Sequence, residues 1–439
     1  MFQTLTGFRD FLPEAFARRA AIFETCRQTA QKFGFLEYDG PVLEPLDLYL
    51  KKSGEEIVSQ LFNFQDKGGK DVSLRPEMTP TLARYIGANF QTLRKPVKWF
   101  TLAENFRFER PQKGRLRSHF QLNADIFGES GVAAEAELIA LLISAFKAFG
   151  LTADDVVVRI SDRELWLAFL KMEGIDEASH LGVLGVIDKM ERVPEEKTLQ
   201  HLEQQLGGDP VQLLRRIRKL CGIRDFDGLE AVFRESDAAL TPEMEARLSH
   251  LQTLFGLLDA YGLSRYIRLD LGIVRGLAYY TGLVFEAFEA SGEGRALAGG
   301  GRYDHLVEKL GGPSVPAIGF GLGDVTLGNL LDEKGLLPDY KEALDVFIVS
   351  GKSEAEQVAT RSLVMQLREA GLSADFSMKS PGFGKQFKEA NLRQAEWVVV
   401  LGSREIEAQE VNLKQMSSGV EETVSLGDLI EKITGVSST

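Results

Sequence analysis

The stretch NFRFERPQKGRLRSHFQLNADIFGE, residues 105–129, decides the fold that we expect. Its two ends alternate polar and apolar residues, which is the pattern of β-strands with one buried face. Gln121, Asn123 and Asp125 fall on one face of the second strand, and the apolar residues between them fall on the other. Arg107 and Glu109 share one face at the end of the first strand. The two strands therefore predict an antiparallel pair with an apolar back and a polar front.

A short cationic segment joins these strands, although the whole chain has a formal net charge of −13. Five basic residues fall within residues 107–117, where Glu109 is the one acid. Alternation alone also fits an ordinary sheet whose polar face lies in water. A binding platform fits as well, because Arg107 can bind a phosphate through two nitrogens, and Gln121 and Asp125 can hold a small polar ligand. The residues themselves leave both interpretations open.

The composition is that of a globular chain with two to three domains. Its 439 residues are 44% hydrophobic and 26% charged. The apolar runs are too short to span a membrane, and the N-terminus carries charges where a signal peptide needs apolar residues. Two cysteines and five histidines without ligand spacing predict no structural metal. We therefore expect a cytoplasmic protein with no membrane segment.

Periodicity predicts an α+β fold whose main sheet is antiparallel, because short connections join the strand-like runs. Helices are expected over 14–33, 79–88 and 133–149, and a wholly helical region over 165–256. After residue 344 the order strand–helix–strand repeats, which predicts a small α/β domain with a largely parallel sheet. The expected domains are a first one formed by 1–164 and 257–331, a helical insertion over 165–256, a linker over 332–343 and a last domain over 344–439.

Three other segments carry residues of the kind that line binding sites. In LRPEMTP, Glu77 precedes a helix start at Thr79, which also fits an ordinary N-cap. In IVRGLAYYTGLVFE, Arg275, Tyr279 and Tyr280 lie in or beside a strand. LAGGGRYDHL contains three consecutive glycines, and glycine in a strand lets a ligand or another backbone approach closely. Each pattern also fits a structural role, so no single one decides the function.

Taken together and in order, these segments resemble the histidyl-tRNA synthetase family, which belongs to the class II aminoacyl-tRNA synthetases. The resemblance extends over nearly the whole chain. The similar segments are TGFRDFLP (6–13, the N-terminal signature), GFLEYDGPVLEP (34–45, the dimer-forming motif 1), SLRPEMTP (73–80, the loop that holds the amino group of histidine), residues 106–129 (motif 2 and its loop), residues 274–286 (the histidine-specific motif), residues 299–312 and residues 344–439 (the anticodon-binding domain).

The resemblance implies roles for individual residues. It makes Arg107 and Arg275 the two catalytic arginines, on opposite sides of the α-phosphate of ATP. It implies that Glu109 and Arg115 also contact ATP. The implied histidine pocket consists of Glu77, Met78, Thr79, Gln121, Asp125, Tyr279 and Tyr280, and the implied contacts to the acceptor end of tRNA are Arg110, Gln112, Lys113 and Arg117.

The implied reaction has two steps. The carboxylate of L-histidine attacks the α-phosphorus of ATP and releases pyrophosphate, and a terminal ribose hydroxyl of tRNA(His) then attacks the histidyl-adenylate. Mg²⁺ neutralises the pyrophosphate. Positioning and charge stabilisation carry such a reaction, and no protein nucleophile is needed. The resemblance to motif 1 further implies a homodimer.

Two places depart from the pattern of the family. The usual RGLDYY reads RGLAYY, so Ala278 stands where a carboxylate is expected. Motif 3 usually ends in Glu–Arg, whose arginine contacts ATP, and here Val325 and Thr326 stand at those positions. Some organellar-type members are similar in having Gly–Asp in motif 3, which marks a subgroup. Our hypothesis is that Arg302 or another basic residue replaces the missing arginine.

Two non-catalytic functions stay open beside the synthetase. One is a paralogue that acts as the regulatory subunit of an ATP phosphoribosyltransferase in histidine biosynthesis. The other is a paralogue that only binds tRNA or protein. Arg107, Arg275, the cationic segment and the C-terminal α/β domain favour the synthetase, because a regulator would keep a histidine pocket without needing ATP chemistry.

Overall fold

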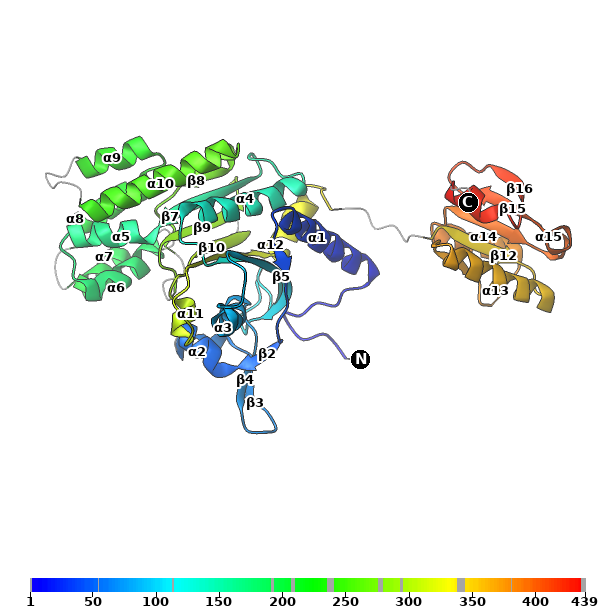
Figure 1. Ribbon diagram of the computed structural model, residues 1–439, viewed down its shortest axis with the longest axis horizontal. Coiled ribbons are helices and arrows are strands. Elements are labelled where there is room, and N and C mark those ends of the chain that lie inside the picture. The colour runs from blue at the N-terminus through cyan, green and yellow to red at the C-terminus, as the bar shows by residue number, and fades with distance from the viewer. Residues whose placement is uncertain are drawn as a thin grey trace. The chain divides into compact units, whose positions relative to one another are not determined.

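The computed structural model describes most of the chain as two compact units, Met1–Pro338 and Asp339–Thr439 (Figure 1). None of its described helices is long and apolar enough to cross a lipid bilayer. The residues described are 2–53, 55–112, 114–190, 193–206, 210–234, 241–274, 279–292, 295–337, 344–379 and 381–435.

The first unit is built on an eight-stranded sheet in the order β1-β5-β6-β11-β10-β9-β7-β8. From β5 to β7 all neighbouring strands run antiparallel, while β1 and β8 pair in parallel at the two edges. The expected antiparallel sheet is therefore confirmed. The strands are β1 (Leu36–Glu37), β5 (Val97–Phe106), β6 (Ser118–Phe127), β7 (Val156–Asp162), β8 (Ile267–Leu269), β9 (Leu283–Glu289), β10 (Ala298–Arg302) and β11 (Ala317–Gly323).

The apolar back of the sheet packs against helices, as the alternation in β6 predicts. Leu122, Ala124 and Ile126 are buried in one core with residues of three helices, among them Cys26 and Leu138. Figure 1 shows α1 and α4 lying across this part of the sheet. Burial of so many apolar side chains is the main force that fixes the orientation of β6. The helices are α1 (Pro13–Lys32), α4 (Val132–Ala148) and α12 (Asp324–Glu333).

Part of the front is also covered, at the end of the sheet near the loop that precedes α3. Leu82 and Ile86 of α3 pack with Phe127, Tyr303 and Val307 in a second apolar cluster. A small sheet in the order β2-β4-β3 lies next to this region in the sequence. These elements are β2 (Leu43–Pro45), α2 (Leu46–Ser53), η1 (Glu55–Gln60), β3 (Asn63–Gln65), β4 (Asp71–Leu74), α3 (Thr79–Asn89) and α11 (Leu306–Lys309).

The region expected to be wholly helical is so in its described residues, and it extends slightly beyond 165–256. Its helices share the core behind the main sheet, since Trp166, Phe169 and Leu258 belong to the same buried cluster as β6. The indole Nε1 of Trp166 donates to the carbonyl of Leu271 at 2.9 Å. The helices are α5 (Arg163–Met172), α6 (Glu177–Ile187), α7 (Glu195–Leu206), α8 (Val211–Gly222), α9 (Phe226–Arg234) and α10 (Pro242–Ala260), and η3 (Ser264–Tyr266) follows them.

The second unit has a five-stranded sheet in the order β13-β12-β14-β15-β16. The expected parallel arrangement is right for β13, β12 and β14 and wrong for β15 and β16, which pair antiparallel. A short turn with Gly419 at φ +72° joins the last two strands and removes the need for a crossover helix. The elements are β12 (Val346–Ser350), α13 (Glu354–Glu369), β13 (Ala374–Phe376), α14 (Phe383–Leu392), β14 (Trp397–Leu401), α15 (Ser403–Ala408), β15 (Glu410–Gln415), β16 (Glu421–Ser425) and α16 (Leu429–Thr434).

Two expected boundaries shift. The strand expected to continue through Glu109 ends at Phe106 as β5, because the chain turns there: the amide of Glu109 donates to the carbonyl of Arg107 at 2.8 Å. The linker expected over 332–343 overlaps α12, which continues to Glu333, and its last six residues lie outside the described part of the chain.

The glycines of β11 make the front of the sheet hollow. Gly319 and Gly321 pair with Asp125 and Asn123 of β6. A Cβ atom on Gly319 would overlap the carboxylate of Asp125, and one on Gly321 would overlap the amide of Gln121. The absence of side chains on β11 therefore gives the polar side chains of β6 their space.

This arrangement predicts the effect of adding a methyl group at Gly319. Gly319→Ala should lower the free energy of unfolding by about 1–3 kcal/mol, because the methyl group would overlap the buried carboxylate of Asp125 and come within 2.9 Å of the hydroxyl of Tyr303. Gly328→Ala is the matched control. Gly328 lies in helix α12, and its Cβ would lie 3.8 Å from Ile22 of α1, so the change should be neutral or stabilise by about 0.5–1 kcal/mol. Urea unfolding measures both, and equal effects of the two variants would contradict this account.

Candidate active site

Two adjoining pockets open on the polar front of the sheet, with volumes of about 540 Å³ and 240 Å³. We call them the large and the small pocket. Four residues line both of them: Arg107, Gln121, Gly299 and Gly321. Among these, Arg107 carries the only charge. A guanidinium on the border of two cavities can contact ligands in both cavities. It can also contact the bond that forms between two such ligands.

The backbone holds Arg107 at this border. Its amide donates to the carbonyl of Arg117 at 2.8 Å, which continues the pairing of the two strands just past the end of β5. Its Nε donates to the carbonyl of Pro76 at 3.1 Å. Pro76 precedes the helix α3, so two other segments hold this residue before any ligand binds: one fixes its backbone and the other its guanidinium. Preorganised charge of this kind is what stabilises a developing negative charge.

The small pocket is lined by polar side chains from several elements. Glu77 and Thr79 come from the start of α3, Gln121 from β6, and Tyr279 and Tyr280 from the segment before β9. Sequence reasoning expected all five of these residues to bind one ligand, and the structure brings them together. The two tyrosine rings lie against each other, tilted by 41°, with centroids 4.3 Å apart.

A buried ion pair supports the carboxylate of Glu77. Lys52, at the end of α2, places its Nζ 2.6 Å from Oε2 of Glu77 and 3.8 Å from the centre of the Tyr279 ring. Burial acts to raise the pKa of Glu77, but the charges of Lys52 and Arg107 outweigh it and leave that pKa lowered. Burial lowers the pKa of Lys52, and the attraction to Glu77 offsets this only in part. Glu77 is therefore an anion at the edge of the small pocket at neutral pH.

Sequence reasoning missed Lys52 and Tyr303. Lys52 is 25 residues from Glu77 in the sequence. The sequence of α2 does not indicate that Lys52 is buried while the adjacent Lys51 is exposed. Tyr303 follows the glycine run and lines the small pocket. Its position close behind the three glycines of GGGRYD is the sequence signal that could have identified it as a pocket residue.

Asp125 and Met78, both expected to bind histidine, do not line the small pocket. The carboxylate of Asp125 is 1% exposed and accepts a hydrogen bond from the hydroxyl of Tyr303, which does line the pocket. Burial raises the pKa of Asp125 to about 7, against the opposing effect of that hydrogen bond. Met78 is fully buried at the N-cap of α3. Asp125 can therefore act through Tyr303, and Met78 is a packing residue.

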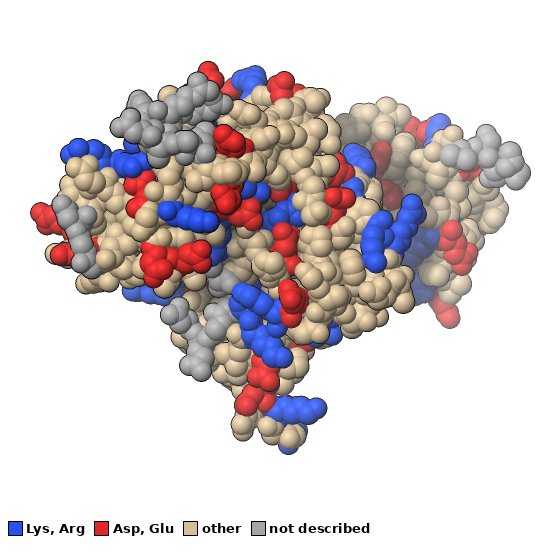
Figure 2. Space-filling model, turned by 60° about the vertical axis from the view of Figure 1, so that its left-hand side comes forward, with Lys and Arg blue, Asp and Glu red and all other residues tan. Residues whose placement is uncertain are grey.

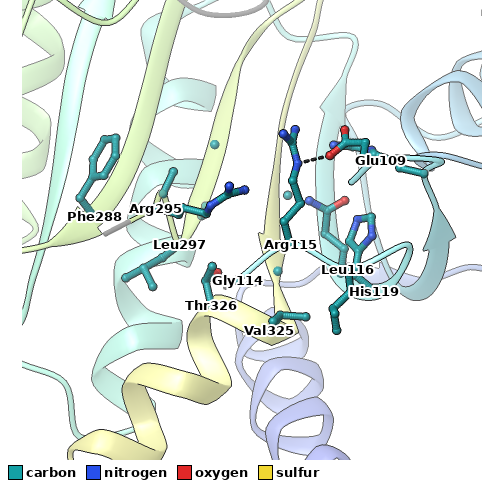
Figure 3. A pocket seen from close by; sticks show the side chains of 17 residues that line it. Glu109, Gly114, Arg115, Leu116, His119, Phe288, Arg295, Leu297, Val325 and Thr326 are labelled. Atoms are coloured by element: carbon teal, nitrogen blue, oxygen red, sulfur yellow. Dashed lines mark ion pairs between the residues drawn. The ribbon is translucent and has the colours of Figure 1, made fainter. Parts of the chain in front are cut away.

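The large pocket is more cationic. Arg115 forms an ion pair through Nε with Glu109, and Arg295 extends from the segment before β10 into the same cavity (Figure 3). His119 of β6 also lines this pocket. Burial lowers the pKa of His119 to about 3, and the charges of Arg107, Arg9 and Arg115 act in the same direction. Its imidazole is therefore neutral at physiological pH, so it can pack against an uncharged aromatic ring of a ligand in this pocket.

Residues of the cationic loop differ in their surroundings. Arg110 and Gln112 are exposed, so they are free to meet a large partner. Arg117 instead braces the loop: its guanidinium lies 4.4 Å from the Phe108 ring centre, and its Nε donates to the carbonyl of Glu109 at 3.2 Å. Lys113 lies outside the described residues. On the face that Figure 2 displays, acidic and basic side chains are interspersed rather than gathered by sign.

Two other expectations concern Arg275 and Arg302. Arg275, the expected second catalytic arginine, and Ala278 lie outside the described residues. The hypothesis that Arg302 replaces the missing phosphate contact is wrong. Its guanidinium is buried and bound to Glu135 at 2.7 Å and Asp304 at 3.3 Å, and it lines neither pocket.

Within the described part of the chain, no three His, Cys, Asp or Glu side chains are grouped as a metal ion requires.

An antiparallel sheet that presents an arginine between two polar pockets, next to a cationic loop between β5 and β6, is the arrangement that the resemblance to the class II aminoacyl-tRNA synthetases leads us to expect. The second unit, with its mixed sheet, is a separate α/β domain.

Comparisons with known proteins define the family. Residues 7–325 match the family model of histidyl-tRNA synthetase, and residues 345–435 match that of the anticodon binding domain. The chain is 50% identical to the histidine–tRNA ligase of Opitutus terrae over 96% of both chains. It is 37% identical to the chloroplastic/mitochondrial histidine–tRNA ligase of Arabidopsis thaliana over 96% of this chain and 85% of that one. The chain therefore belongs to the histidyl-tRNA synthetase family.

Solved structures agree on the fold. The histidyl-tRNA synthetase from Nostoc sp. PCC 7120 superposes with a TM-score of 0.81 at 26% identity, covering 99% of each chain. A protein from Bacillus halodurans, described as an ATP phosphoribosyltransferase regulatory subunit/histidyl-tRNA synthetase, superposes with a TM-score of 0.75 at 23% identity over 92% of this chain and 99% of that one. At that identity the second match supports the fold alone.

The ion pair beneath the small pocket predicts a large difference between two neighbouring lysines. Lys52→Met should lower the free energy of unfolding by about 3 kcal/mol, because it leaves Glu77 without its buried partner. Lys51→Met is the matched control: Lys51 is exposed on the same helix, and its loss should change stability by less than about 0.5 kcal/mol.

Adding Glu77→Gln to Lys52→Met should recover part of the lost stability, since it removes the stranded charge. Urea unfolding at pH 7 measures all four proteins. If Lys52→Met and Lys51→Met behave alike, the ion pair does not have the role assigned to it.

Proposed function

We propose that this chain is a histidine–tRNA ligase, which binds L-histidine in the small pocket and ATP in the large one. It forms histidyl-adenylate and transfers histidine to the 3′ end of tRNA(His). The observation that carries the proposal is the position of Arg107 between the two pockets. The two substrates must react where their sites meet, and a guanidinium fixed there meets the α-phosphate at the moment of attack.

In the first step the carboxylate of histidine attacks the α-phosphorus of ATP. The new bond joins a carboxylate oxygen to that phosphorus, and the bond to the bridging oxygen breaks and releases pyrophosphate. Arg107 stabilises the negative charge on the α-phosphate oxygens, as a preorganised donor does. Glu77, held as an anion by Lys52, attracts the ammonium group of histidine and so orients the carboxylate toward Arg107.

The polar lining of the small pocket suits an imidazole. A neutral imidazole donates through one nitrogen and accepts through the other. Tyr279, Tyr280 and Tyr303 supply hydroxyls, and Gln121 supplies an amide that can do either. An amino acid whose side chain lacks these groups leaves buried polar atoms without partners. Such sites reject non-polar analogues strongly, which gives selectivity for histidine.

Mg²⁺ would accompany ATP and neutralise the charge of the pyrophosphate. Glu109 is the one carboxylate among the described residues that line the large pocket, so it is the residue that would hold the metal together with the phosphates. In the second step a ribose hydroxyl of tRNA attacks the carbonyl carbon of histidyl-adenylate, and AMP leaves. The exposed Arg110 and Gln112, with Lys113, contact the acceptor end, and the C-terminal α/β unit, which matches an anticodon binding domain, reads the anticodon.

We also propose that the enzyme is a cytoplasmic homodimer. The segment that resembles motif 1 presents apolar side chains to solvent: Leu36 is 66% exposed, Val42 45% and Leu43 41%. Tyr85 of α3 adds a further 45% exposed ring. Leu36 and Tyr85 line one cavity. Exposed apolar side chains that gather in this way mark interaction surfaces, and a second copy of the chain is the partner that the family provides. The regulatory-subunit alternative is not favoured, because a regulator does not need a built nucleotide pocket.

Histidine-dependent exchange of pyrophosphate into ATP tests the first step. The purified protein should catalyse it, and Arg107→Ala should reduce kcat by roughly 100-fold or more. Arg110→Ala is the matched control from the same loop. It should keep the exchange activity and weaken only the transfer of histidine to tRNA. A protein that lacks exchange but stimulates a phosphoribosyltransferase partner would be a regulatory subunit instead, and one with neither activity would be a binding paralogue.

A further inference from the structure

The large pocket lacks the arginine that motif 3 usually provides, yet it holds a cation that has not been accounted for. Val325 and Thr326, at the start of α12, line the pocket where that arginine is expected. Neither side chain can neutralise a phosphate. A triphosphate bound here would place its negative charge beside a valine and a threonine, so another residue must supply the positive charge.

Arg295 lies beside this vacant position. A Cβ atom built on Gly114 would lie 3.3 Å from Cγ2 of Thr326 and 3.4 Å from Cδ of Arg295. The stem of Arg295 and the side chain of Thr326 therefore border the same small space. Figure 3 shows Arg295 on the opposite wall from Arg115, with Gly114 and Thr326 between and below them. The side chain comes from the β9–β10 connection, a different element from the helix that carries the usual arginine.

The charges of the large pocket differ in how far they are already neutralised. Arg115 forms an ion pair with Glu109. Within the described residues no carboxylate forms an ion pair with Arg295, whose Nη2 donates instead to the neutral amide oxygen of Gln112 at 2.5 Å. Arg107 borders the small pocket and is fixed at the other end of the cavity. Arg295 is thus the cation in this pocket whose charge is most available to a ligand.

We propose that Arg295 binds the β- and γ-phosphates of ATP in place of the motif 3 arginine. This inference rests on the proposed function, since it assigns a contact to the same nucleotide. The two arginines then contact different phosphates. Arg107 contacts the α-phosphate, where bonds form and break, and Arg295 contacts the phosphates that leave as pyrophosphate. Its bond to Gln112 holds the guanidinium at the pocket wall until the triphosphate displaces it or shares it.

Arg295→Ala tests the proposal through the pyrophosphate exchange reaction. The KM for ATP should rise roughly 10- to 100-fold, as expected for loss of a charged hydrogen-bond donor, while the KM for histidine stays unchanged. The dissociation constant of AMP should also stay unchanged, because AMP has no β- or γ-phosphate. Arg295→Lys should recover part of the affinity for ATP, since it keeps the charge and loses the planar fork.

Arg265→Ala is the matched control, because Arg265 is an exposed arginine that lines neither pocket. Its loss should leave the KM for ATP unchanged. If Arg265→Ala raised the KM for ATP as much as Arg295→Ala does, the effect would not come from the pocket and the proposal would be overturned. An Arg295→Ala enzyme with normal KM for ATP, or with AMP weakened as much as ATP, would overturn it too. A wild-type protein without exchange activity would instead contradict the proposed function itself.

Discussion

The pairing of β6 with β11 is the constraint on which the site depends. One strand presents polar side chains on its front, and the other presents glycines at the facing positions. The apolar residues of β6 are buried behind the sheet, so the strand cannot rotate its polar face away or shift by one residue without exposing that core. The hollow front, and both pockets on it, follow from this single arrangement.

Electrostatics then divides the front into two parts. In the small pocket the carboxylate of Glu77 stays ionised because Lys52 accompanies it into the interior. In the large pocket His119 stays neutral, since burial and three nearby arginines all oppose its protonation. Arg107 belongs to both parts. A negative pole for an ammonium group and a cationic region for phosphates thus lie on either side of one fixed guanidinium, an order complementary to the charges along an aminoacyl-adenylate.

Much of this could be predicted from the sequence, for a physical reason. Alternation with period two sets the two faces of β6, and regular helical periodicity sets α1, α3 and α4, so these elements are local properties of the chain. The residues that sequence reasoning missed make contacts between distant segments. Lys52 reaches Glu77 across the α2–α3 interface, and Tyr303, directly after β10, reaches Asp125 of β6 across β11. Local pattern cannot indicate such pairs.

The same limit explains the error at Arg302. Its neighbours in the sequence are glycines and a tyrosine that do line the small pocket, but alternation along β10 directs its own side chain to the opposite face, toward Glu135. The resemblance to the family implies that a phosphate-binding arginine is missing at Thr326, and the folded chain places Arg295 beside that position.

A crystal structure with a non-hydrolysable analogue of histidyl-adenylate tests the central claim most directly. The account predicts the imidazole among the tyrosines of the small pocket, the adenosine in the large pocket, and the linkage that replaces the acyl phosphate within hydrogen-bond distance of Arg107. An analogue bound with its linkage remote from Arg107, or lying wholly inside one of the two pockets, would contradict it.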